Sequence, residues 1–154
     1  MLTITENLSQ LYEEDYILWL EKNIQFIKDG KFKYVDLENL IEELESLGKS
    51  EKRTVESLIK QIIIHLLLYQ YWDKEREWNG EHSVTEILAF RDDLKFDIKS
   101  KTIYNYAQSQ LDNIYESALK RAQSKSKLQS FPSECPYTLA QIIDENWLPS
   151  ISNQ

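Results

Sequence analysis

The segment DLENLIEELESLGKS, residues 36–50, carries five carboxylates among four leucines and one isoleucine. On a helical wheel of about 100° per residue, Glu38, Glu42 and Glu45 share one polar flank, and Glu43 lies on the other. Such a row could bind a hard cation, which takes oxygen ligands, or act as a general base. Metal sites in helical bundles usually add a Glu-x-x-His pair, which this chain lacks. We therefore favour a solvated acidic edge, with Glu42 and Glu45 as weak candidate metal ligands.

His65 lies inside the apolar stretch IIIHLLLY, residues 62–69, and is expected to be at least partly buried. Its ring nitrogens then need hydrogen-bond partners, which a nearby carboxylate or a tyrosine hydroxyl could supply. Buried polar groups are normally hydrogen-bonded whatever their role, so we favour a structural histidine. The alternative is that His65 ligates a metal ion or carries a proton.

Arg91 occupies a position where an aliphatic side chain is expected. The inner face of its predicted helix is defined by Val84, Ile87, Leu94 and Ile98. A buried guanidinium without a counter-charge is very costly, which predicts an ion pair with Glu42, Glu43 or Glu45. The alternative is that Arg91 lines a cleft and binds an anionic ligand through its planar fork.

Cys135 is the only cysteine, so the chain cannot form an internal disulfide. No basic residue or histidine lies near it in sequence, and we favour a structural thiol over a nucleophile, although folding could bring His65 or His82 to it. The sequence has no GxSxG, no Gly-rich phosphate loop and no HExxH motif. It therefore predicts no cofactor and leaves open whether the protein is an enzyme.

The composition indicates a soluble globular chain, with 42% hydrophobic and 29% charged residues. The net charge of −8 repels phosphate backbones, so nucleic acid is not an expected partner. The start MLTITENLSQ resembles no secretory signal, and residues 62–69 are too short to span a bilayer. We expect a cytoplasmic protein with one domain over residues 1–154 and a core at about 9–149.

Helical periodicity dominates the chain, and Gly30, Gly48 and Gly80 are the expected helix breaks. Five helices are predicted, at about 11–29, 36–47, 50–77, 83–98 and 102–124. Ser50 and the capping-box pattern SVTE at 83–86 are expected to begin the third and fourth helices. The second helix has an apolar face made of Leu37, Leu40, Ile41, Leu44 and Leu47.

The tail FPSECPYTLAQIIDENWLP, residues 131–149, predicts a proline-stiffened extended segment and a short helix capped by Thr138. Its large apolar anchors should pack onto the body of the protein. The predicted fold is therefore all-α: a single-domain helical bundle of about five helices, with a proline-containing C-terminal segment and a short terminal helix packed on it.

Five motifs together resemble the DUF29 family, which is abundant in cyanobacteria. They are YEEDYILWL (12–20), DLENLIEELESLGKSEKR (36–53), HLLLYQYW (65–72), EILAFRDDL (86–94) and the tail 131–149. The resemblance implies an all-helical domain with no established activity. The family's characteristic positions fall here on Tyr12, Asp15, Trp19, Asp36, Glu42, Glu43, Glu45, His65, Leu66, Arg91, Pro132 and Pro136.

Two classes of function remain after these exclusions. The first is a small interaction or regulatory module whose partner is another protein, with homo-oligomerisation left open. The acidic surface and the aromatic content suit this hypothesis. The alternative is a metal- or anion-dependent enzyme or ligand-binding domain that uses Glu42, Glu45, His65 and Arg91.

Overall fold

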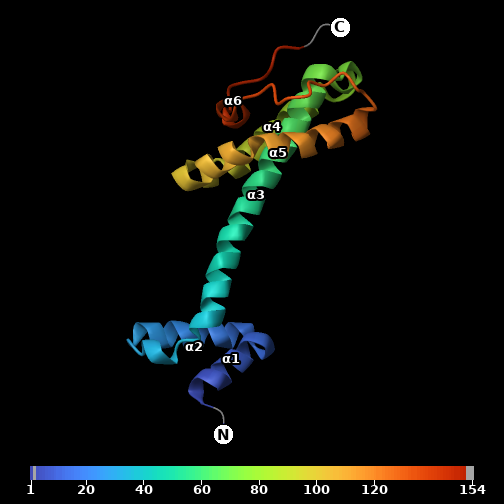
Figure 1. The fold of residues 1–154 in the computed structure, drawn as a ribbon. Helices are drawn as coiled ribbons and strands as arrows, with labels where there is room; N and C mark the ends of the chain where they lie inside the picture. The colour runs from blue at the N-terminus through green and yellow to red at the C-terminus, as the bar shows by residue number, and fades with distance from the viewer. Residues whose placement is uncertain (2, 152–154) are drawn as a thin grey trace. The chain divides into compact units, whose positions relative to one another are not determined.

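The computed structural model describes residues 1 and 3–151, except for the side chains of residues 75 and 79. Every regular element in this part of the chain is helical, as Figure 1 shows. The elements are α1 (Ile4–Glu14), α2 (Tyr16–Lys28), η1 (Phe32–Tyr34), α3 (Leu37–Tyr71), α4 (Asp73–Leu94), η2 (Asp97–Lys99), α5 (Lys101–Ser126) and α6 (Leu139–Ile143). The predicted all-α class with five longer helices and a short terminal helix is confirmed. None of the described helices is long and apolar enough to cross a bilayer.

The chain divides into two compact units, Met1–Lys49 and Ser50–Gln154, which we call the first and the second unit. The first unit contains α1, α2, η1 and the beginning of α3. The second unit contains the rest of α3 together with α4, η2, α5 and α6.

In the first unit, Asp15 separates two helices where one helix over 11–29 was expected. Its backbone leaves the helical region (φ −149°, ψ 82°), and its side chain accepts a hydrogen bond from the backbone N–H of Leu18. An aspartate N-cap satisfies an otherwise unpaired amide and so begins a new helix. The predicted break at Gly30 is confirmed, because this residue follows α2 with a φ of 70°.

Helix α3 runs without interruption through Gly48 and Ser50, so the prediction of two separate helices there was wrong. A single helical glycine costs only about 1 kcal/mol relative to alanine, and no proline follows to stop the helix. The helix ends instead at Tyr71, and the extended backbone of Trp72 separates it from α4. Arg76 stabilises this break by donating from Nη1 to the carbonyl oxygens of Tyr69 and Gln70.

The expected start of a helix at Ser83 was also wrong, because α4 already begins at Asp73 and passes through Gly80. Ser83 is buried in the middle of α4 and caps nothing. The residues of a capping box can also occur inside a helix, so the pattern SVTE alone does not mark a helix start.

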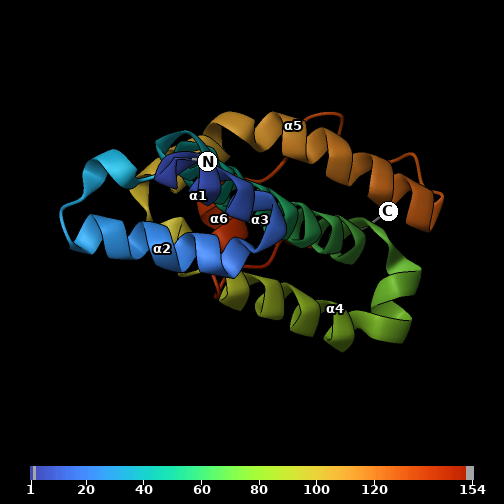
Figure 2. The same cartoon turned by 90° about the horizontal axis from the view of Figure 1, so that it is seen from below.

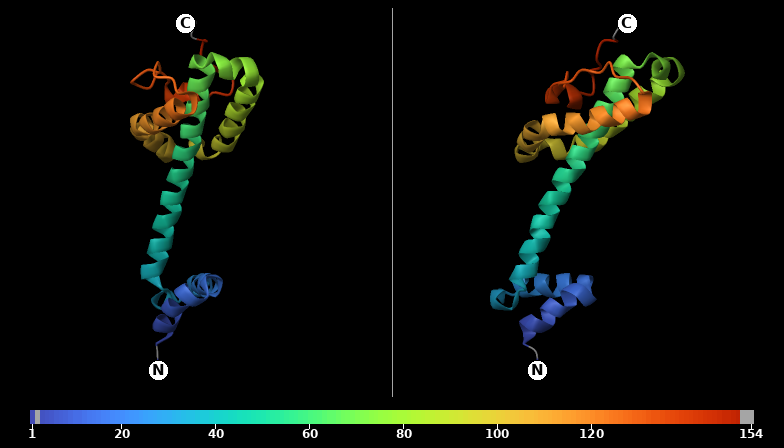
Figure 3. Two further views of the ribbon diagram at one scale, coloured as in Figure 1. Left: turned by 90° about the vertical axis from the view of Figure 1, so that its right-hand side faces the viewer. Right: turned by 45° about the vertical axis from the view of Figure 1, so that its right-hand side comes forward.

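The core of the second unit surrounds the middle of α3, where residues 62–68 are apolar on nearly every side of the helix. Figures 2 and 3 show α3 running between α4 and α5. Helix α5 contributes Ala107, Ala118 and Ala122 to this core, and all three are fully buried. The predicted role of this stretch as the central, buried helix is confirmed.

The C-terminal segment packs on the second unit as expected. Phe131, Tyr137 and Leu139 belong to the same buried cluster as the middle of α3. Helix α6 begins at a capping box in which Thr138 and Gln141 exchange hydrogen bonds. The large apolar side chains therefore hold the proline-containing segment against the body of the unit.

Candidate functional site

A pair of tyrosines engages one acid of the segment 36–50. The hydroxyl groups of Tyr12 and Tyr16 donate to Oε1 and Oε2 of Glu43, at 2.5 and 2.7 Å. These two hydrogen bonds lower the pKa of Glu43. The hydrogen bond from Tyr12 to Glu43 also raises the pKa of Tyr12 to about 12. Glu43 therefore joins α1 and α2 to α3 inside the first unit.

Asp36 is the centre of a second, buried network in the first unit. Its Oδ2 accepts hydrogen bonds from Nε1 of Trp19 at 2.9 Å and from Nδ2 of Asn39 at 2.8 Å. Its backbone N–H donates to Oδ1 of the buried Asn23. The indole of Trp19 also packs edge-on against the ring of Tyr12. Satisfied buried polar networks of this kind fix one arrangement of the packed elements.

Glu38, Glu42 and Glu45 lie on the other flank of α3 and are exposed. Within the described residues they form no hydrogen bond or ion pair. No group of three His, Cys, Asp or Glu side chains in that part of the chain is arranged to hold a metal ion. The three glutamates form a solvated acidic edge on the first three turns of α3.

Beside this edge, the apolar face of α3 is exposed. We call Leu37, Ile41, Leu44 and Leu47 the α3 stripe; their exposed fractions are 62%, 47%, 60% and 61%. Glu43 and Asn39 point to α1 and α2 on the opposite flank, so the contacts inside the first unit leave the stripe uncovered. Helix α2 adds the exposed side chains of Ile17, Ile24 and Ile27.

In the second unit, Arg91 is only 1% exposed, and each of its three guanidinium nitrogens donates to the C-terminal segment. Its Nε donates to the carbonyl oxygen of Ile142 at 2.8 Å, Nη1 to that of Trp147 at 2.8 Å and Nη2 to that of Gln141 at 3.1 Å. Burial lowers the pKa of Arg91, and the charges of Asp144 and Glu145 oppose that shift.

The prediction that Arg91 forms an ion pair with Glu42, Glu43 or Glu45 was therefore wrong. The last carbonyl groups of a helix have no partner within the helix and carry partial negative charge. Gln141 and Ile142 supply such carbonyls at the end of α6, and they satisfy the guanidinium in place of a carboxylate. Pattern reasoning missed these acceptors because a backbone carbonyl is present at every residue and gives no sequence signal.

His65 lies on α3, and its half-buried ring stacks on that of Phe90 from α4, with centroids 5.6 Å apart. The four candidate residues are divided between the two units. Glu42 and Glu45 belong to the first unit, and His65 and Arg91 belong to the second.

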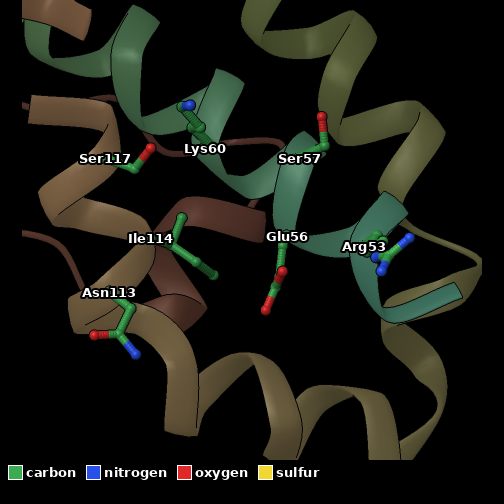
Figure 4. Close-up of a pocket in the computed structure, with 7 residues that line it drawn as sticks. All are labelled: Arg53, Glu56, Ser57, Lys60, Asn113, Ile114 and Ser117. Atoms are coloured by element: carbon green, nitrogen blue, oxygen red, sulfur yellow. The ribbon is translucent and has the colours of Figure 1, made fainter. Parts of the chain in front are cut away.

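A pocket of about 340 Å³ lies between α3 and α5 in the second unit, and Figure 4 shows its lining. It is lined by Arg53, Glu56, Ser57, Lys60, Asn113, Ile114 and Ser117. Glu56 and Ile114 point toward the space between the helices, whereas Arg53 extends away from them. Glu56 already accepts a hydrogen bond from the hydroxyl of Tyr106 at 2.6 Å. None of the four candidate residues lines this pocket.

Cys135 is half-buried, and its Sγ donates to the carbonyl oxygen of Tyr137 at 3.3 Å. Burial raises the pKa of the thiol, which opposes formation of the nucleophilic thiolate. This geometry agrees with the interpretation of Cys135 as a structural thiol.

The family model described as Domain of unknown function DUF29 matches residues 11–148. The chain belongs to the DUF29 family. No curated protein and no solved structure matches significantly. The DUF29 match includes most of both units, and it adds no activity to what the contacts show.

Several of the residues that carried the DUF29 resemblance have structural roles here. Asp15 caps α2, Trp19 binds Asp36, and Tyr12 binds Glu43. These contacts explain why the motifs YEEDYILWL and DLENLIEELESLGKS occur together, since each supplies partners for the other. In contrast, Glu42 and Glu45 have no such role within the first unit.

Proposed function

We propose that this DUF29 protein is a protein-interaction module with a regulatory role, and that its first unit carries the binding surface. The observation behind this proposal is the distribution of exposed apolar side chains. Of the sixteen large hydrophobic side chains that are exposed in the described structure, eleven belong to Met1–Lys49, which is 49 of the 154 residues. Four of these side chains, the α3 stripe, lie along one face of a single helix, and an exposed apolar patch of this kind marks an interaction site.

The rest of the first unit argues against a loosely formed surface. Trp19 and Leu8 are buried, and the Asp36 and Glu43 networks fix α1 and α2 against the beginning of α3. The unit therefore holds the α3 stripe on a rigid helix. A surface presented by a rigid element loses less conformational entropy on binding.

The contacts give less support to a metal- or anion-dependent activity at Glu42, Glu45, His65 and Arg91. Each of the three guanidinium nitrogens of Arg91 already donates to a backbone carbonyl oxygen, and the two glutamates extend into solvent. A free thiol at Cys135 suits a reducing compartment, so we place the interaction in the cytoplasm.

The experiment compares the wild-type protein with Leu37→Ser/Leu44→Ser, each tagged and purified from the native host at moderate salt. We expect one protein to co-purify with the wild type in a near-stoichiometric amount and to be depleted at least tenfold with the double variant. The purified partner should also bind the purified wild-type protein when the two are mixed. Leu88→Ser is the matched control, because Leu88 is an exposed leucine of α4 in the second unit.

Circular dichroism of both variants must match that of the wild type. A partner retained equally by all three proteins would contradict the assignment of the surface. A wild-type protein that repeatedly purifies alone would contradict the proposed function itself.

A further inference from the structure

The partner of the α3 stripe can be specified by its chemistry. We propose that the stripe binds an amphipathic helix of another protein, with an apolar face flanked by lysine or arginine. This inference rests on the proposed function, because it names the class of partner that the interaction surface takes.

The spacing of the exposed residues fits a helix better than an extended peptide. Leu37, Ile41, Leu44 and Gly48 follow one another at i, i+4, i+7 and i+11, which places them in a single row along α3. This spacing is that of a helix–helix seam, in which side chains of one helix enter the gaps of the other. At Gly48 an added Cβ would meet no atom within 4 Å, so the row ends at an open position where a second backbone can approach closely.

Charge complementarity specifies the polar flank of the partner. Glu38, Glu42 and Glu45 line one edge of the row and have no ion pair within the described residues. The first unit has 11 acidic and 5 basic side chains, which gives it −6 of the chain's net charge of −8. Opposite charges beside a helical seam set the choice of partner, and like charges there are destabilising.

The same charges disfavour a second copy of this chain as the occupant. A parallel pair of α3 helices would set the acidic edge of one copy against the opposite flank of the other copy, which α1 and α2 already occupy through Asn39 and Glu43. An antiparallel pair could oppose glutamates to Lys49 and Lys52 only if its twofold axis lay near residue 46. That register sets Leu37 of one copy against residue 55 of the other, and Val55 is fully buried within the second unit. A self-complex therefore meets an occupied flank when it is parallel, and either repulsion between acidic edges or an inaccessible row when it is antiparallel.

The test uses the full-length protein and three fluorescent 18-residue peptides in anisotropy titrations. The first peptide has leucine on one helical face and lysine on the flanks, the second replaces each lysine with glutamate, and the third is a scrambled form of the first. We expect the basic peptide to bind the wild type at least tenfold more tightly than the other two. Its affinity should fall with increasing salt, because the flanking charges are exposed.

Two variants locate the binding on the stripe. Leu44→Ser should weaken binding of the basic peptide at least fivefold, whereas the control Leu88→Ser should leave it unchanged. Glu38→Gln/Glu45→Gln removes two charges and keeps the apolar row, so it should weaken binding and flatten the salt dependence. Because these positions are exposed, the variants should keep the wild-type circular dichroism, which is measured in parallel.

Several results would overturn the inference. Equal binding of the basic and acidic peptides, or binding unchanged by Leu44→Ser, would show that the stripe does not select a basic helix. A dimer in sedimentation velocity that Leu44→Ser dissociates would identify a second copy as the occupant and leave the proposed interaction function standing. A monomer that binds no peptide and in which Leu44→Cys, in a Cys135→Ser background, resists thiol labelling would show that the chain covers its own stripe, and would contradict both proposals.

Discussion

Replacing Arg91 with methionine tests whether this side chain holds the C-terminal segment or serves a ligand. Methionine keeps much of the volume of the side chain and removes every hydrogen bond to the carbonyl oxygens of Gln141, Ile142 and Trp147. If the arginine is structural, the substitution must lower the free energy of unfolding. If it serves a ligand, folding should be nearly unaffected.

The size of the effect follows from these three bonds. A hydrogen bond to a charged group contributes about 1.5–3 kcal/mol net, and burying the guanidinium cancels part of that gain. We therefore expect Arg91→Met to lower the free energy of unfolding by about 3–4 kcal/mol. Arg91→Lys should lower it by about 2 kcal/mol, because an ammonium group cannot reach three carbonyls with the planar fork of a guanidinium.

The assay is urea unfolding followed by circular dichroism, together with hydrogen exchange of the amides in residues 139–147. The amides of this segment should exchange faster in Arg91→Met, because the segment loses its attachment to α4. Arg121→Met is the matched control, since Arg121 is exposed on α5. The reasoning is refuted if Arg91→Met differs from this control by less than about 0.5 kcal/mol and exchange in 139–147 is unchanged, since surface substitutions usually stay within that range.

Three further predictions concern the first unit and α3. Trp19→Phe removes the indole donor to the buried Asp36 and should cost about 1–3 kcal/mol in thermal or urea unfolding. Gly48→Ala should stabilise α3 by about 0.5–1 kcal/mol, because the glycine is helical and an added Cβ meets no atom within 4 Å; a loss of stability would contradict this. The hydrogen bond to Glu43 raises the pKa of Tyr12 in the folded protein from 10.0 to about 12. The stabilisation that this bond gives is therefore fully present below pH 10 and is lost as the pH rises through 12. Tyr12→Phe should remove that alkaline loss, and unfolding curves of both proteins at pH 9–12 measure it.

The helical content was predictable because apolar periodicity is a strong local signal. The positions of the breaks between helices were less predictable. Gly30 ends α2 because its φ is positive, but Gly48 and Gly80 are ordinary helical residues. The break at Trp72 depends on Arg76, which binds carbonyl groups at the end of α3 from the following helix. Glycine alone is therefore an ambiguous signal, and the contact that decides a boundary can lie outside the local pattern.

The candidate site was predictable as a set of unusual residues and not as a set of contacts. Arg91 stood out because a guanidinium on an inner helix face must find acceptors, and the structure confirms its burial. Its three acceptors lie 50, 51 and 56 positions further along the chain. They are backbone carbonyl groups, for which the residue type carries no information. Similarly, Glu43 could be separated from Glu42 and Glu45 by the wheel, but its tyrosine partners could not be identified.

The α3 stripe shows why periodicity cannot distinguish a core from a binding surface. Leu37, Ile41 and Leu44 have the same spacing as Val55, Ile59 and Ile62 on the same helix, yet the first group is exposed and the second is fully buried. Burial away from water is favourable for both groups of side chains. The spacing does not indicate whether the same chain or another protein buries them. What differs is the flank: acidic side chains without partners border the exposed group, whereas packed α4 and α5 surround the buried one. The proposed basic partner helix rests on this difference, because an incomplete core would not require charge of one sign along its edge.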